Sequence, residues 1–106
     1  MGILEFLGME NNTAEIKDFK QRGALILDVR TKEEFDQGHI ANSINIPLQV
    51  IRNQESVQQI KSYEKPIIAC CRSGNRSGQA ARILKEFNIE VINGGAWDEL
   101  DSLLEQ

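Results

Sequence analysis

Short apolar runs and amphipathic stretches alternate along this chain, and their spacing predicts its secondary structure. Residues 24–27 and 66–70 are continuous apolar runs, which is typical of strands that are covered on both faces. Shorter strands are predicted at 44–46 and 90–92. Residues 77–87 carry apolar side chains at the i, i+3, i+4 and i+7 positions, and this spacing predicts an amphipathic helix.

Capping residues and glycines mark the ends of the remaining helices. Asn12 opens a predicted helix that Gly23 ends, and Thr31 with Glu34 forms the capping box of a short second helix. Two further helical segments are predicted, at 48–62, where the pattern is broken, and at 96–104.

The alternation of strands and helices predicts an α/β fold with a parallel sheet. No repeat, linker or low-complexity stretch interrupts the pattern, so one domain is expected over residues 1–106. In parallel sheets the ligand site lies beyond the carboxyl ends of the strands. Asp28 and Arg30 follow one predicted strand and Cys71 follows another, so we expect these three residues to share one edge.

Composition narrows the class of protein. The chain has 106 residues, of which 41% are hydrophobic and 26% charged, as in ordinary soluble domains. Its net charge of −4 argues against a nucleic-acid surface, and no segment reaches transmembrane length. Two adjacent cysteines make no disulfide framework, and the first seven residues lack a basic signal-peptide region. We therefore expect a cytoplasmic protein without a membrane or nucleic-acid partner.

Residues 70–77, with the sequence CCRSGNRS, carry most of the chemistry. A thiol stands where a predicted strand ends and a helix begins. Unpaired N–H groups and the helix dipole favour an anion there, so the pKa of a cysteine in this loop should fall. Arg72 and Arg76 add positive charge.

The same loop has residues suited to a tight turn around an anion. Gly74 allows a positive φ, and Asn75 tolerates left-handed geometry. Ser77 is predicted to cap the helix that follows. Together they predict a nest of backbone N–H groups.

Residues 71–77 resemble the active-site loop of the rhodanese family. Three further segments match the family's signatures in the right order: 27–30 (LDVR), 33–47 (EEF, GHI and INIP within it) and 93–97 (NGGAW). The resemblance covers roughly residues 24 to 104. It implies an open, twisted parallel sheet of four to five strands flanked by helices on both faces. Four strands are recognisable, and a fifth would have to lie in residues 1–10; a small docking helix is the alternative for that segment.

The resemblance implies a sulfurtransferase without metal or other cofactor. Cys71 would take sulfane sulfur from a donor such as thiosulfate, form a persulfide, and pass the sulfur to a thiol or cyanide acceptor. Thioredoxin-like or persulfide-carrying proteins are implied as further partners, while the oligomeric state is left open. The implied substrate-binding residues are Arg72, Ser73, Gly74, Asn75, Arg76 and Ser77, with Asp28 and Arg30 in support.

Because the two cysteines are adjacent, the length of the loop up to Arg76 can be counted from either one. Counted from Cys70, Arg76 completes the C-x5-R spacing of cysteine phosphatases and arsenate reductases. Neighbouring residues of a strand face opposite sides, so only one thiol can face the loop, and the positions of Gly74 and Ser77 favour Cys71. Cys70 is then a packed core thiol, a resolving thiol or one half of a vicinal disulfide.

A sulfur carrier that serves a protein partner is a second candidate function, since it would use the same loop and the same Cys71. Two ring-bearing residues outside the loop are interpreted as structural. His39, the only histidine, is expected to support the fold rather than to act as a catalytic base. Trp97 is expected in the core.

Overall fold

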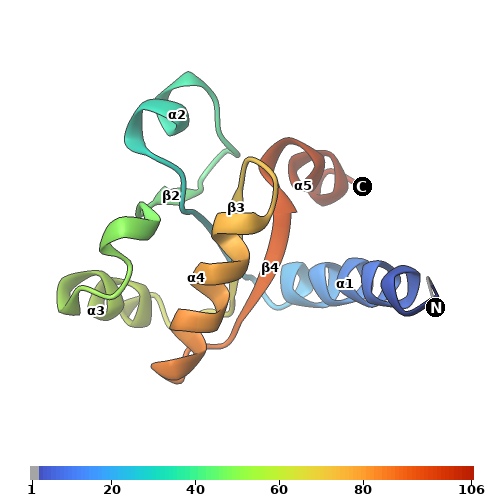
Figure 1. Ribbon diagram of the computed structural model, residues 1–106, viewed down its shortest axis with the longest axis horizontal. Coiled ribbons are helices and arrows are strands. Elements are labelled where there is room, and N and C mark those ends of the chain that lie inside the picture. Colours follow the sequence, from blue (N-terminus) through green and yellow to red (C-terminus); the bar gives the residue numbers. More distant parts are fainter. Residues whose placement is uncertain (1–2) are drawn as a thin grey trace.

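The computed structural model describes the backbone of residues 3–106 and the side chains of residues 12–106. Four parallel strands form a sheet in the order β2-β1-β3-β4, with helices on both faces (Figure 1). The strands are β1 (Leu25–Asp28), β2 (Ile44–Asn45), β3 (Ile67–Cys71) and β4 (Val91–Ala96). The helices are α1 (Ile3–Gln21), α2 (Lys32–Gln37), the 3-10 turn η1 (Leu48–Val50), α3 (Gln54–Ser62), α4 (Asn75–Glu86) and α5 (Trp97–Leu104). The predicted fold class is confirmed.

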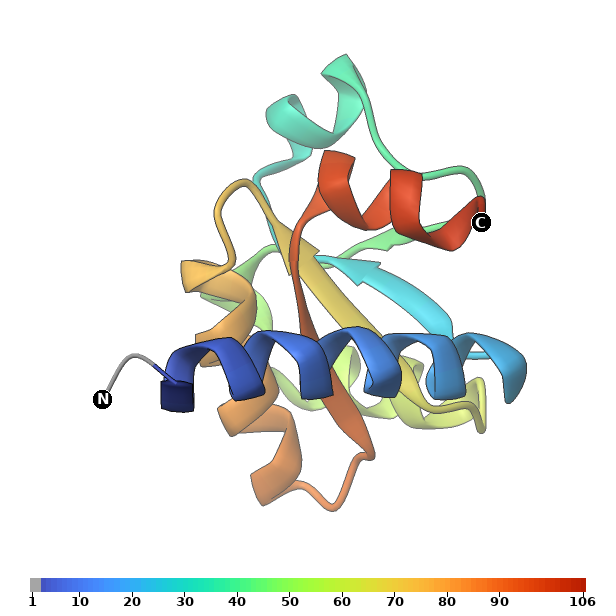
Figure 2. The same cartoon turned by 90° about the vertical axis from the view of Figure 1, so that its right-hand side faces the viewer.

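The central strand β3 is buried on both faces, and its side chains alternate between two cores. Ile67, Ala69 and Cys71 belong to the core on the side of α3 and α4. Ile68 and Cys70 belong to the core on the side of α1 and α5. Figure 2 shows α1 lying across this second face, with α5 beside it. The continuous apolar run of the sequence is explained by this double burial.

The N-terminal segment differs from the expectation of a fifth strand. Helix α1 begins at Ile3 and continues to Gln21, so residues 3–10 and the predicted helix after Asn12 form one helix. The Asn12 capping pattern therefore lies inside a helix, although Asn is a weak helix former that costs up to about 0.7 kcal/mol relative to Ala. Residues 1–2 lie outside the described part of the chain.

The start of α4 also differs from the prediction. Gly74, with a φ of 98°, is the N-cap, and the helix begins at Asn75. Ser77 lies within the first turn and does not cap the helix; its hydroxyl bonds elsewhere. Asn75 has no positive φ, because Gly74 alone makes the left-handed turn. The capping box of Thr31 and Glu34, in contrast, is confirmed at the start of α2.

Strand β4 is longer than predicted, and it contains a bulge. Ala69 pairs with Asn93, but Cys70 pairs with Gly95, so Gly94 is the extra residue. A Cβ on Gly94 would lie 2.6 Å from Ile68 Cγ2. Glycine at this position lets β4 pass close to β3.

The helices differ in length, but within residues 3–106 none is long and apolar enough to cross a membrane.

Candidate active site

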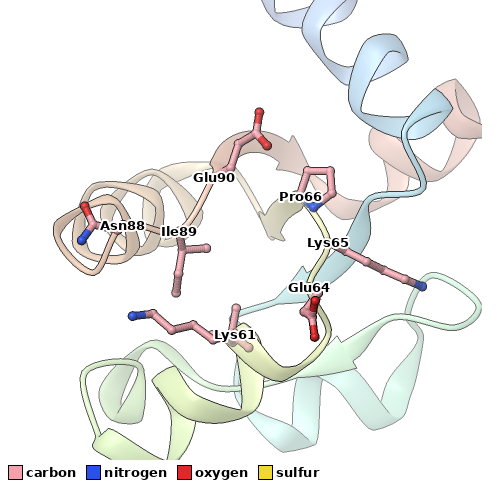
Figure 3. Close-up of a pocket in the computed structure, with 8 residues that line it drawn as sticks. Lys61, Glu64, Lys65, Pro66, Asn88, Ile89 and Glu90 are labelled. Carbon is pink, nitrogen blue, oxygen red and sulfur yellow. The ribbon is translucent and has the colours of Figure 1, made fainter.

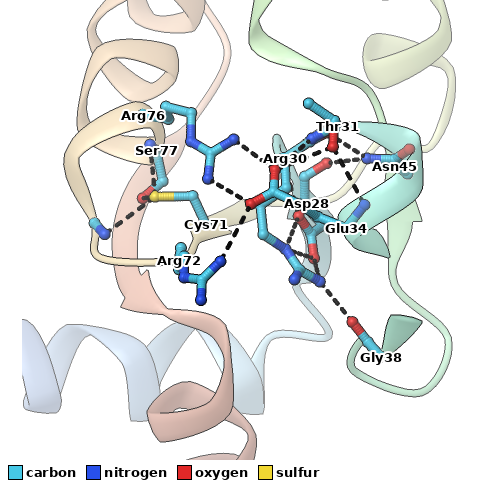
Figure 4. A network of polar contacts seen from close by, with 11 residues as sticks. Asp28, Arg30, Thr31, Glu34, Gly38, Asn45, Cys71, Arg72, Arg76 and Ser77 are labelled. Carbon is cyan, nitrogen blue, oxygen red and sulfur yellow. Dashed lines mark hydrogen bonds and ion pairs between the residues drawn. The ribbon is translucent and has the colours of Figure 1, made fainter. Parts of the chain in front are cut away.

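The loop after β3 and the residues after β1 meet at one edge of the sheet, as predicted. The two strands are parallel, and Asp28 is in register with Cys70. Asp28, Arg30 and the loop of Cys71 are therefore neighbours, together with the start of α2 (Figure 4).

The thiol of Cys71 lies inside the loop and is fully buried. Its Sγ accepts hydrogen bonds from the backbone N–H groups of Gly74 (3.0 Å) and Ser77 (3.4 Å). The hydroxyl of Ser77 lies 3.3 Å from the same sulfur. Burial alone would raise the pKa of Cys71, but the hydroxyl and the N–H groups of the loop outweigh it, so this pKa lies below its ordinary value.

Cys70 has the opposite environment. It is fully buried in the core beside α1 and α5, on the other face of the sheet. Burial, together with the charge of Asp28, raises the pKa of Cys70 far above its ordinary value. Cys70 is therefore a neutral core thiol, and Cys71 is the thiol held by the loop.

A further layer of hydrogen bonds supports the loop from β4. Ser77 Oγ donates to Asn93 Oδ1 (2.7 Å), and Asn93 Nδ2 donates to the carbonyl of Gly74 (3.0 Å). Asn93 Oδ1 also accepts from the N–H of Gly95 (3.0 Å). Sequence reasoning treated Asn93 only as part of the double-glycine signature and missed this contact with the loop.

Arg76 points away from the sulfur and towards α2. Its guanidinium makes two hydrogen bonds to Glu34, of 2.7 and 3.0 Å. These bonds, with that from the Thr31 backbone, lower the pKa of Glu34 to about 2. Sequence reasoning missed this role, because the capping box already gave Glu34 a local partner.

Arg30 links three elements beneath the loop. Its guanidinium binds the carboxylate of Asp28, at 2.8 Å for the shortest contact, and donates to the carbonyl of Gly38 (2.6 Å). It also lies over the ring of Trp97, 4.8 Å from the centroid. The arginine that Asp28 orients is thus Arg30. Trp97, expected in the core, packs against the core beside α1 and α5 but is only half-buried, at the rim of the site.

The remaining predicted residues lie at the outer side of the loop or beyond it. Arg72, Ser73 and Asn75 are exposed. Asn75 Oδ1 accepts from Gln79, 3.4 Å away. His39 is exposed; its ring stacks on Phe35 and bonds the Phe35 carbonyl, contacts that suit a structural role.

A surface hollow of about 310 Å³ opens beside the loop. Its walls come from β1, α2, the loop and α5: Arg30, Glu34, Gln37, Gly38, Arg72, Trp97 and Asp98. A second hollow, of about 320 Å³, lies at the opposite end of the sheet, around Pro66 and Glu90 (Figure 3). Since that end carries the amino ends of β3 and β4, it is not where parallel sheets bind ligands.

Metal-binding side chains do not gather at this edge or elsewhere in the described residues. Among them, no group of three or more His, Cys, Asp or Glu side chains could hold a metal ion.

Comparisons with known proteins agree with this geometry. The model of the rhodanese-like domain matches residues 12–98. The chain is 36% identical over 102 residues to thiosulfate sulfurtransferase 18 of Arabidopsis thaliana, covering 81% of this chain and 75% of the relative. It is 39% identical over 78 residues to the adenylyltransferase and sulfurtransferase uba4 of Ogataea parapolymorpha. This match covers 70% of the chain but only 20% of that relative's length.

Solved structures include the same architecture. The rhodanese-related protein of Thermoplasma volcanium superposes with a TM-score of 0.66 at 29% identity, covering 88% of this chain and 87% of that one. The residues matched by the family model include the loop of Cys71 and the strand end at Asp28. The chain belongs to the rhodanese-like domain family.

Proposed function

We propose that this protein is a sulfurtransferase that moves sulfane sulfur from thiosulfate to a thiophilic acceptor through a persulfide on Cys71. The observation that carries the proposal is the environment of the Cys71 sulfur, which accepts two backbone N–H bonds and lies beside the Ser77 hydroxyl. A thiolate is the reactive form of cysteine, and these donors favour it.

The reaction proceeds in two balanced steps. The Cys71 thiolate attacks the sulfane sulfur of thiosulfate, the S–S bond of the donor breaks, and sulfite leaves with the bonding electron pair. In the second step an acceptor thiolate attacks the outer sulfur of the persulfide, and the electron pair returns to the Cys71 sulfur. No oxidant or cofactor is consumed, and both enzyme forms are anions that the loop can hold.

The size of the loop favours sulfur over phosphate. Arg76 is the sixth residue of the loop counted from Cys71, and the N–H groups of Gly74 and Ser77 both converge on one sulfur atom. The rival phosphatase or arsenate reductase would use Cys70, whose side chain lies in the opposite core.

A second candidate function is delivery of sulfur to or from a protein partner. Two observations favour it. The Cys71 thiol is fully buried. The chain also matches 20% of the length of a relative whose name joins sulfur transfer to a second activity, adenylyl transfer. Such a carrier would form the same persulfide but turn over thiosulfate slowly.

Intact mass after thiosulfate treatment tests the proposal. We expect one added sulfur atom that maps to Cys71 and is removed by cyanide. A mass that stays unchanged, or a sulfur that maps to Cys70, would contradict the proposal. Fast loading with slow steady-state turnover would favour the protein-partnered carrier, and hydrolysis of an aryl phosphate without loading would favour the phosphatase.

A further inference from the structure

The hollow beside the loop is larger than a small inorganic donor requires. Its volume of about 310 Å³ equals roughly ten water molecules and reaches the lower end of small-molecule sites, about 300 Å³. One wall is Arg72, the residue next to Cys71 in the chain. The hollow therefore borders the loop that holds the sulfur and has room for an organic molecule.

Most charges around the hollow already have partners. Arg30 is bonded to the carboxylate of Asp28, and both side chains are buried. Arg76 is bonded to Glu34 through two hydrogen bonds. Because the charges within each pair compensate each other, the two pairs add little net charge to the hollow.

Two wall residues keep their charges available. The side chain of Arg72 is 78% exposed, and its guanidinium lies 4.0 Å from Glu34, at the limit of an ion pair. Asp98 is exposed on the first turn of α5, where one of its oxygens accepts a hydrogen bond from the N–H of Glu99. The hollow thus presents one cation and one anion to a ligand.

The lining of the hollow also includes an apolar surface, the ring of Trp97. One face of the Trp97 ring is covered by the guanidinium of Arg30, and the ring is half-buried in the wall of the hollow. It offers a surface for the methylene groups of a ligand.

We propose that this hollow binds the sulfur acceptor and selects a zwitterionic thiol, that is, a small thiol carrying a carboxylate and an ammonium group. Arg72 binds the carboxylate and Asp98 binds the ammonium group, while Trp97 packs on the carbon chain. A neutral, dipolar ligand complements one cation and one anion better than an anion or a cation alone does. The inference rests on the persulfide chemistry of the proposed function.

The step that this site serves is balanced without a further reagent. The thiolate of the bound acceptor attacks the outer sulfur of the Cys71 persulfide and forms a new S–S bond. The bond between the Cys71 sulfur and the outer sulfur breaks, and its electron pair stays on Cys71.

The test uses the full chain, loaded with thiosulfate and freed of excess donor. Loading is measured first by intact mass. The loaded protein is then discharged by four thiols that differ in charge: L-cysteine (zwitterion), cysteamine (cation), mercaptopropionate (anion) and mercaptoethanol (neutral). Each rate is divided by the concentration of the acceptor's thiolate form, so that differences in the pKa of the four thiols do not affect the comparison.

We expect L-cysteine to discharge the persulfide fastest. Arg72→Gln should slow L-cysteine and mercaptopropionate by about threefold, the size expected for an exposed ion pair, and should spare cysteamine. Asp98→Asn should slow L-cysteine and cysteamine and spare mercaptopropionate. Arg82→Gln on α4 and Glu99→Gln on α5, both exposed, are matched controls that should change none of the four rates.

The outcomes separate this inference from the proposed function. Absence of loading contradicts the proposed function itself. Two outcomes with normal loading overturn the inference alone. In the first, the discharge rate does not depend on the charge of the acceptor; in the second, both variants lose the same fraction of rate with all four thiols.

Discussion

The hydroxyl of Ser77 donates a hydrogen bond to Asn93 Oδ1 at 2.7 Å, while its oxygen lies 3.3 Å from the Cys71 sulfur. A hydroxyl has one proton, so it cannot donate to both groups at once. Asn93 Oδ1 keeps a second donor, the N–H of Gly95, when the hydroxyl rotates towards a thiolate. Asn93 therefore positions the group that stabilises the ionised form of Cys71.

This relationship predicts the effect of Asn93→Ala. The hydroxyl of Ser77 and the carbonyl of Gly74 lose their partner, the loop loosens, and the pKa of Cys71 should rise. Because hydrogen bonds to charged groups contribute about 1.5–3 kcal/mol, we expect persulfide formation at neutral pH to slow by at least roughly tenfold.

Ultraviolet absorbance of the thiolate, followed against pH, checks this prediction without requiring reagent access to a buried sulfur. A Cys70→Ala background leaves Cys71 as the only cysteine. Asn53→Ala, an exposed residue whose side chain makes no capping bond to α3, is the control. A titration midpoint that does not move in the Asn93 variant would refute the positioning role.

The ion pair of Glu34 and Arg76 predicts a pH-dependent stability. The folded pKa of Glu34 is about 2, below its ordinary value of 4.5. Its contribution is therefore present above pH 4.5 and is lost as the pH falls through about 2. The side chain of Glu34 is 23% exposed, and because solvent screens part of the interaction we expect roughly 1–2 kcal/mol.

Urea unfolding of wild type and Glu34→Gln measures this contribution. The stability difference should be largest near neutral pH and should shrink between pH 4.5 and 2. Glu33→Gln, an exposed neighbour on the same turn, is the control. A difference that is constant with pH would mean that the charge of Glu34 is not what stabilises the fold.

What could be predicted from sequence was local. The run of residues 66–70 and the helix at 77–87 are recognisable from spacing alone, and together they place the loop between a strand and a helix. The rule that neighbouring strand residues face opposite sides also separated Cys70 from Cys71. That separation is seen in the two cores on either side of β3.

What could not be predicted depends on partners distant in the chain. Arg76 bonds Glu34, 42 residues away, and Ser77 bonds Asn93, 16 residues away. Local patterns indicated capping roles for Glu34 and Ser77. For Glu34 the cap and the ion pair coexist, whereas for Ser77 the helix begins two residues earlier and frees the hydroxyl for the loop.

The bulge in β4 predicts a steric effect at Gly94. A Cβ there would lie 2.6 Å from Ile68 Cγ2, 2.9 Å from Leu100 Cδ2 and 3.0 Å from the carbonyl of Ala69. Overpacking of this kind costs about 1–3 kcal/mol, so Gly94→Ala should lower the midpoint of thermal unfolding.

Gly23→Ala separates this effect from backbone strain. Gly23 has a positive φ of 79°, but nothing lies within 4 Å of its Cβ position. It should cost only the strain of a left-handed residue, about 1 kcal/mol. If Gly94→Ala lost less stability than Gly23→Ala, the result would contradict the close passage of β4 past β3.

The two cysteines should respond to substitution in opposite ways. Cys71→Ser removes the sulfur that the loop holds, so it should abolish loading from thiosulfate while leaving the fold intact, because serine is close in size. Cys70→Ala leaves the loop unchanged and opens a small cavity between β3 and the core beside α1. We expect it to retain most of the sulfur transfer and to lose about 1 kcal/mol of stability. Thiosulfate-to-cyanide transfer and urea unfolding of both variants measure the two effects. An inactive Cys70→Ala variant that folds normally would mean that the longer register, counted from Cys70, is the functional one.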